Sequence, residues 1–238
     1  MLAALLQNGV GTPAFDVASV RPSGAPFSTG AKTGPGRLTI AGASLSDLVQ
    51  QAYGVSDIQI SGIPDLGRFD IEGKAEGSHA RGELLEMLQA LLADRFKLTL
   101  HHETRELPAA ALVAGKSALK MQPAANGDDP AISLRAGKSP GSVVIRGQNV
   151  TMAQVANYLS NRLRRVVVDQ TRLAGNFDFS IEFSQDENDL RDQSVPVRES
   201  VNHLFTDFVE KVGLKLESRR LSVDVLAIDH AETPAANE

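Results

Sequence analysis

Two stretches decide the fold: Gly36-Arg-Leu-Thr-Ile-Ala-Gly42 and Gly141-Ser-Val-Val-Ile-Arg-Gly147. Each is a short run with β-branched residues, bounded by glycines, which is typical of a strand that ends in a turn. A pattern that occurs twice along one chain is the usual signature of an internal repeat. The two stretches therefore predict that this chain contains two copies of one structural unit.

A helix-start signal follows each stretch. Ser44 has Asp47 three residues on, and Thr151 has Gln154 three residues on. A hydroxyl residue followed at this spacing by a side chain that can accept a hydrogen bond from its backbone is a capping box. The sequence therefore predicts helices that begin just after Ser44 and Thr151.

The second half of the unit is also repeated. Leu66-Gly-Arg-Phe-Asp70 corresponds to Leu173-Ala-Gly-Asn-Phe-Asp178, and each opens a strand with alternating apolar and polar residues. An amphipathic helix follows in each copy, and then two strands, expected at 96–103 and 109–114 and at 214–220 and 221–229.

These elements predict an α+β fold made of two diverged β-α-β-α-β-β units, with helices packed on a mixed or antiparallel sheet. The expected boundaries are a lead strand and loop at 1–35, the first unit at 36–114, a linker or surface loop at 115–140, the second unit at 141–230 and a tail at 231–238.

The composition excludes several function classes. The net charge is −5 and aromatic residues make up 5% of the chain, which argues against nucleic-acid binding. The densest basic run, Arg162, Arg164 and Arg165, is interpreted as a solvated helix end. The absence of cysteine excludes disulfides and thiolate chemistry.

No apolar run in the sequence approaches the roughly 20 residues of a membrane span. The apolar start, Met1 to Leu6, is either a leader remnant or an ordinary chain start.

Several short motifs occur in order along the chain. They are Phe-Asp-Val-Ala-Ser-Val-Arg-Pro (15–22), Ala-Tyr-Gly-Val (52–55), Gln-Ile-Ser-Gly (59–62), Arg-Phe-Asp-Ile-Glu (68–72), Met-Leu-Gln-Ala-Leu-Leu-Ala-Asp-Arg-Phe-Lys-Leu (87–98), His-Glu-Thr-Arg-Glu (102–106) and Ile-Asp-His (228–230). In this order they resemble a soil-associated family expanded in Acidobacteria, over about residues 14–232. The resemblance implies an exported or membrane-attached protein, since members typically begin with a leader, and it implies no activity, because the family is one of unknown function. The second unit also resembles, at the level of fold alone, the N-terminal periplasmic domains of secretins and TonB-dependent receptors.

The candidate nucleophile is a serine. Ser139 lies in Gly-Lys-Ser-Pro-Gly (137–141), which formally matches the nucleophile-elbow pattern. That elbow needs a strand before it and a helix after it, whereas here a Gly/Pro-rich stretch precedes and a strand follows. A surface loop is the favoured interpretation.

The histidine candidates are His101, His102 and His230, with Glu103 and Glu106 near the first two. His102 falls on the apolar face of its expected strand, which favours a partly buried, hydrogen-bonded histidine at a strand end. The functional alternative is a general base or metal ligand.

The carboxylate candidates form two groups. Asp186, Glu187, Asp189 and Asp192 make an oxygen-rich stretch that could bind calcium, although a solvated acidic loop is favoured. Asp70 and Asp178 occupy equivalent places in the two units, which favours a structural role such as capping a turn over paired catalytic carboxylates.

Two functions remain as hypotheses. The first is an extracytoplasmic module that binds a small molecule or an envelope protein, because no strong catalytic motif is present. The second is a hydrolase of small esters or lactones, for example acyl lactones, supported by calcium. Calcium is the only cofactor that the residues suggest. The sequence fixes neither the ligand nor the oligomeric state. Histidine and carboxylate groups that converge in a cleft would favour the hydrolase. Histidine and carboxylate groups that are scattered and solvated would favour the binding module.

Overall fold

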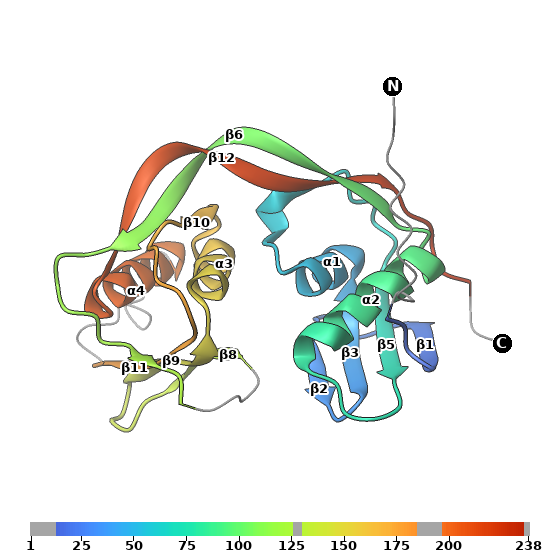
Figure 1. Cartoon of the computed structure of the whole chain (residues 1–238), viewed down its shortest axis with the longest axis horizontal. Helices are drawn as coiled ribbons and strands as arrows, with labels where there is room; N and C mark the ends of the chain where they lie inside the picture. The colour runs from blue at the N-terminus through green and yellow to red at the C-terminus, as the bar shows by residue number, and fades with distance from the viewer. Residues whose placement is uncertain (1–12, 126–129, 185–196, 236–238) are drawn as a thin grey trace. The chain divides into compact units, whose positions relative to one another are not determined.

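Spatial contacts divide the chain into two units that exchange segments along the sequence. In the computed structural model, which describes residues 13–125, 130–184 and 197–235, unit 1 comprises 1–53, 63–100 and 228–238. Unit 2 comprises 54–62 and 101–227. Each unit has helices on one face of an antiparallel sheet, which confirms the predicted α+β class (Figure 1).

Unit 1 is built on a four-stranded sheet with the order β1-β5-β3-β2. Alternation decides its faces: Phe69 and Ile71 of β5 are buried under the helices, whereas Glu72 and Lys74 are exposed. The ring of Phe96 meets that of Phe69 edge to face, with centroids 5.0 Å apart. The elements are β1 (Val17–Pro22), β2 (Lys32–Gly34), β3 (Arg37–Ser44), α1 (Leu45–Tyr53), β5 (Arg68–Lys74) and α2 (Arg81–Arg95).

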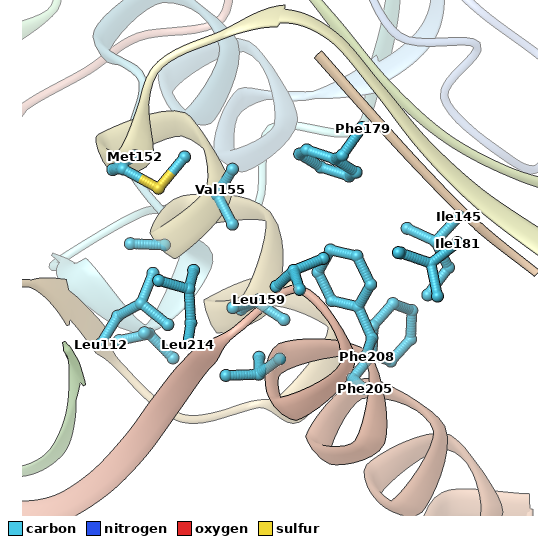
Figure 2. Close-up of a cluster of buried hydrophobic side chains, with 14 of the residues drawn as sticks. Leu112, Ile145, Met152, Val155, Leu159, Phe179, Ile181, Phe205, Phe208 and Leu214 are labelled. Atoms are coloured by element: carbon cyan, nitrogen blue, oxygen red, sulfur yellow. The ribbon is translucent and has the colours of Figure 1, made fainter. Parts of the chain in front are cut away.

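Unit 2 has a sheet of the corresponding order, β7-β11-β9-β8, and two helices. Figure 2 shows the core of this unit, in which side chains from the sheet, the helices and two long strands meet. The rings of Phe179 and Phe208 lie with centroids 5.4 Å apart. The elements are β7 (Gln122–Pro123), β8 (Ala131–Ala136), β9 (Val143–Val150), α3 (Met152–Leu163), β11 (Phe177–Phe183) and α4 (Val197–Lys211).

A third sheet, β10-β6-β12-β4, completes unit 2. Its central strands are long, and the division between the units falls within them. Leu112 of β6 and Leu214 of β12 close the core over the helices (Figure 2). The elements are η1 (Asp57–Gln59, a 3-10 helix), β4 (Ile60–Ser61), β6 (Thr99–Ala114), β10 (Val167–Asp169) and β12 (Leu214–His230).

Two features differ from the sequence predictions. The expected strand pairs at 96–103 and 109–114 and at 214–220 and 221–229 are single strands, β6 and β12. Pro108 sits inside β6 without breaking it, and on the side of β10 no N–H is needed there, because β10 pairs with β6 only from Ala110 onward. In addition, the segment expected to be a linker, 115–140, contributes β7 and β8 to the sheet of unit 2.

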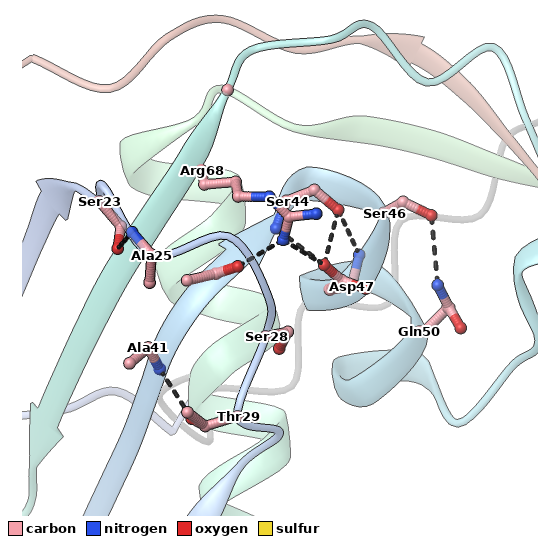
Figure 3. Close-up of polar contacts among 12 residues, drawn as sticks. Ser23, Ala25, Ser28, Thr29, Ala41, Ser44, Ser46, Asp47, Gln50 and Arg68 are labelled. Atoms are coloured by element: carbon pink, nitrogen blue, oxygen red, sulfur yellow. Dashed lines mark hydrogen bonds and ion pairs between the residues drawn. The ribbon is translucent and has the colours of Figure 1, made fainter.

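The predicted capping boxes are confirmed. The backbone N of Ser44 donates to Asp47 at 2.9 Å, and the N of Asp47 donates back to the Ser44 hydroxyl at 3.2 Å (Figure 3). Thr151 and Gln154 make the same reciprocal pair, at 2.9 and 3.2 Å. These contacts satisfy N–H groups that a helix leaves open at its start, so α1 and α3 begin where the sequence places them.

Candidate functional site

The first histidine candidate belongs to a chain of charges along one face of β6. His101 contacts Glu103 at 3.1 Å, and Arg105 donates to the other oxygen of Glu103 at 2.7 Å. The hydrogen bond from Arg105 and then that from His101 lower the pKa of Glu103. Glu103 is therefore held as a carboxylate, which suits an ion-pair network better than a general acid.

His102 lies on the opposite face of β6 and pairs across the sheet. Its Nδ1 is 2.8 Å from Oδ2 of Asp224 on β12. The side chains are 64% and 60% exposed, so the prediction that His102 is partly buried is wrong. β6 is buried only from about Ala109 onward, and the face that carries His102 and Asp224 is exposed on both strands, whereas Val223 and Val225 of β12 are buried. Asp224 was missed because nothing in the sequence sets the register of β6 against β12.

The other predicted candidates do not join this pair. His230 contacts Glu232 at 2.8 Å in unit 1. Ser139 is exposed in the β8–β9 connection, and its hydroxyl has no partner within the described part of the chain. Glu106 accepts a hydrogen bond from Ser222. No described contact therefore joins a nucleophile to a histidine base.

The predicted calcium ligands Asp186, Glu187, Asp189 and Asp192 lie outside the described residues. Within residues 13–125, 130–184 and 197–235, no three His, Asp or Glu side chains are grouped so that they could hold a metal ion. The prediction of calcium therefore gains no support from the described residues.

Asp70 and Asp178 have the structural role that the sequence favoured. Asp70 accepts from the backbone N of Gly42 at 2.8 Å, and Asp178 accepts from that of Asn149 at 2.7 Å. Gly42 and Asn149 both have positive φ, 67° and 50°. Each carboxylate thus stabilises a β-bulge near the end of β3 or β9, which we call the turn into the following helix. The predicted structural role is confirmed, although the feature is a bulge within the strand.

A hollow of unit 2 lies on the face of its sheet that the helices leave open. Its volume is about 600 Å³. The floor is formed by β9 and β11, and residues 119–122 form a rim that includes Leu119 and Met121. We call this hollow the sheet groove. Its polar lining side chains are Lys120, Gln122, Arg146, Gln148, Asp178 and Ser180.

Arg146 is the central charge of the sheet groove. Its neighbours across the sheet are Ser180 on β11 and Ser133 on β8. Among the described residues, Arg146 has no hydrogen-bond or ion-pair partner. Glu182, which follows on β11, accepts instead from the Ser142 hydroxyl at 2.7 Å and from the N of Lys138 at 3.0 Å. The N–H donors of the Arg146 guanidinium are therefore open to solvent.

A glycine shapes the floor of the groove. A Cβ at Gly147 would overlap the ring of Phe179, the residue directly opposite on β11. The missing side chain lets the Phe179 ring pack across β9 on the helix side, where it joins the core (Figure 2). This packing holds β9 and β11 in register, and so fixes Arg146 and Ser180 side by side on the other face.

Of the residues that line the groove, sequence reasoning singled out Asp178 and not Arg146 or the rim. Alternation along β9 places Arg146 and Gln148 opposite Ile145 and Gly147, and this signal was readable. The rim at residues 119–122 could not be predicted from alternation, because it lies within the segment expected to be a linker.

The fold and the groove together define an α+β chain with a polar, solvent-open hollow, and in its described part no contact joins a nucleophile to a histidine base. The chain belongs to the family described as "Protein of unknown function (DUF3738)", whose model matches residues 46–231. No curated protein and no solved structure matches the chain. Among the described helices, none is both long and apolar enough to cross a membrane.

Proposed function

We propose that this chain is a non-catalytic, extracytoplasmic binding module, and that the sheet groove of unit 2 holds its ligand. The location follows from the resemblance to a soil-associated, exported family. The observation that carries the binding role is Arg146, an uncompensated cation in the middle of a groove of about 600 Å³. Hollows of this size suit small ligands, and a few convergent polar groups fix their orientation.

The lining chemistry favours a small polyhydroxy acid. Arg146 and Lys120 match a carboxylate, whereas the amides of Gln122 and Gln148 and the hydroxyl of Ser180 suit hydroxyl groups. Asp178 accepts from the backbone of Asn149, and its one negative charge stands against the two cations, so the lining keeps one positive charge in excess.

The second candidate function, hydrolysis of small esters or lactones, draws on the contact between His102 and Asp224. A carboxylate beside a histidine can orient it as a general base. Both side chains are more than half exposed, however, and the sheet groove has neither of them in its lining. Scattered, solvated groups of this kind favour binding over turnover.

The test is calorimetric titration of the purified chain with glucuronate, and with glucose as the uncharged counterpart. We expect Arg146→Gln to weaken glucuronate binding by about tenfold or more, the usual loss of a hydrogen bond to a charged group. Glucose should bind more weakly than glucuronate and respond little to the substitution.

The matched control is Arg135→Gln. Arg135 lies on the same open face, exposed on the edge strand β8, and is not part of the groove lining. Equal loss of glucuronate binding in both variants would overturn the assignment. The binding role itself would fail if the chain hydrolysed esters or lactones in a way that His102→Ala or a calcium chelator abolished.

A further inference from the structure

A second hollow of unit 2, of about 530 Å³, lies where the end of α3 approaches α4 and the two long strands. Pro108, Leu163 and Leu216 contribute its apolar lining, which we call the apolar wall. Arg164, Arg165, Asn202 and Thr206 contribute its polar lining. A hollow that combines apolar surface with a cation suits a ligand with a hydrocarbon body and an acidic end.

The two arginines of this hollow differ in how they are used. Arg164 forms an ion pair with Asp57 of η1 and is 60% exposed. Arg165 is partly buried, and its guanidinium makes one hydrogen bond in the described structure, to the hydroxyl of Ser218 at 3.2 Å. A guanidinium that loses water without gaining a carboxylate is unfavourable. An anion from outside the chain would correct this imbalance.

The backbone holds Arg165 in place. Arg164 ends α3 in the left-handed conformation, with φ of 51°, and the N of Arg165 donates back to the carbonyl of Ser160 at 3.3 Å. The buried hydroxyl of Ser160 then accepts from the N of Val167 at 2.8 Å. Hydrogen bonds to Ser160 therefore hold the backbone at Arg165 and at Val167, which fixes where the Arg165 side chain leaves the chain.

We propose that this hollow, which we call the arginine hollow, binds a monocarboxylate with an aliphatic body, whose carboxylate is clamped by Arg165. Guanidinium and carboxylate groups match in a planar, two-bond geometry. The amide of Asn202 can donate a further bond. Because Arg164 is already neutralised by Asp57, one cation is uncommitted, which fits a single negative charge. The proposal is independent of the sheet groove.

The experiment is titration of the full chain with octanoate, followed by NMR on the arginine side-chain Nε–H signals and by calorimetry. We expect the Arg165 signal to shift on binding and the Arg146 signal to stay in place. Arg165→Gln should weaken octanoate binding by about tenfold or more. The control Arg162→Gln should leave it unchanged, because Arg162 lies over the ring of Tyr158 and does not line the hollow.

Three further arms keep the proposal falsifiable. Octanol lacks the charge and should bind at least tenfold more weakly, whereas octyl phosphate binding more tightly than octanoate would overturn the carboxylate assignment. If Arg165→Gln fails to fold, Leu216→Asn removes part of the apolar wall and should weaken octanoate more than acetate. A loss of binding in Arg146→Gln, or an unchanged affinity in Arg165→Gln, would place the ligand elsewhere and overturn the arginine hollow.

Discussion

The open sheet faces of the two units have corresponding strand orders but hollows of different size and different cation placement. In unit 1 the hollow on that face is about 260 Å³, and the cations Arg37 and Lys74 lie directly opposite each other on β3 and β5. In unit 2 the hollow is about 600 Å³, and Arg146 lies between two serines. Each lining contains two cations and one carboxylate, so the two faces differ in the room around the cations and not in net charge. The same scaffold thus presents one narrow surface with adjacent cations and one wider surface with a single arginine between hydroxyl groups.

The turns that lead into α1 and α3 give a sharper comparison, because there the units use the same device with different residues. Gly42 and Asn149 each donate a backbone N–H to an aspartate on the neighbouring strand. Arg68 donates to the carbonyl of Gly42 at 2.6 Å, and Asn176, two residues before Asp178, donates to the side chain of Asn149 at 2.7 Å. In unit 1, however, the chain at 25–27 crosses directly over the turn.

The largest effect should come from substituting the glycine of this pair. A Cβ at Gly42 would overlap the carbonyl oxygen of Phe27 and lie 2.9 Å from the Cβ of Ala25, at a positive φ. Gly42→Ala should therefore destabilise unit 1 by about 3 kcal/mol, the sum of overpacking and a left-handed alanine. Hydrogen exchange, followed by mass spectrometry, would show the loss of protection in the peptides of unit 1.

The matched substitution is Asn149→Gly, which should change stability by less than about 1 kcal/mol. Glycine relieves the left-handed backbone, and this gain offsets the lost hydrogen bond from Asn176. Equal costs for the two substitutions would mean that the crossing chain at 25–27 does not distinguish the two turns.

These turns also show what the sequence could predict. Helix starts and the two aspartates were readable because each depends on contacts between residues close in sequence or on a repeated phrase. The exposure of His102, its partner Asp224 and the rim of the sheet groove depend on strand register and on weak strands. A two-residue strand such as β7 has no periodicity of its own, and only its pairing with Phe177 and Asp178 defines it. Whether the corresponding sheets arose by duplication of one unit stays a prediction.

The second effect concerns how the stabilisation that Asp70 provides depends on pH. The hydroxyl of Ser23 and then the backbone N of Gly42 lower the pKa of Asp70. A carboxyl group whose pKa is lower in the folded state stabilises the fold above its unfolded pKa of about 4, and this stabilisation is lost as the pH falls through the folded value. We therefore expect Asp70→Asn to lower the free energy of unfolding at pH 7. The loss should be smaller than the loss that Gly42→Ala causes.

Urea denaturation between pH 7 and pH 2 would measure this difference, which should shrink toward the acid end. At pH 7, Asp178→Asn should cost less than Asp70→Asn, because in the described structure Asp178 accepts only from Asn149. If the difference in free energy of unfolding between wild type and Asp70→Asn stayed constant down to pH 2, the charge of Asp70 would not be what stabilises the turn.

The smallest effect concerns the capping boxes, where the units are most alike. Ser44→Ala and Thr151→Ala each remove a hydroxyl that accepts a backbone N–H, which costs about 1 kcal/mol.

The second partner of each capping box, Asp47 or Gln154, should respond differently to substitution. Asp47 also pairs with Arg68 at 3.5 Å (Figure 3), whereas Gln154 is neutral. Asp47→Ala should therefore cost more than Gln154→Ala, by a few tenths of a kcal/mol for a partly exposed pair. A double-mutant cycle between Asp47 and Arg68 isolates that difference. A coupling of zero would leave the boxes equivalent and confine the contrast between the units to the turn at Gly42 and to the open sheet faces.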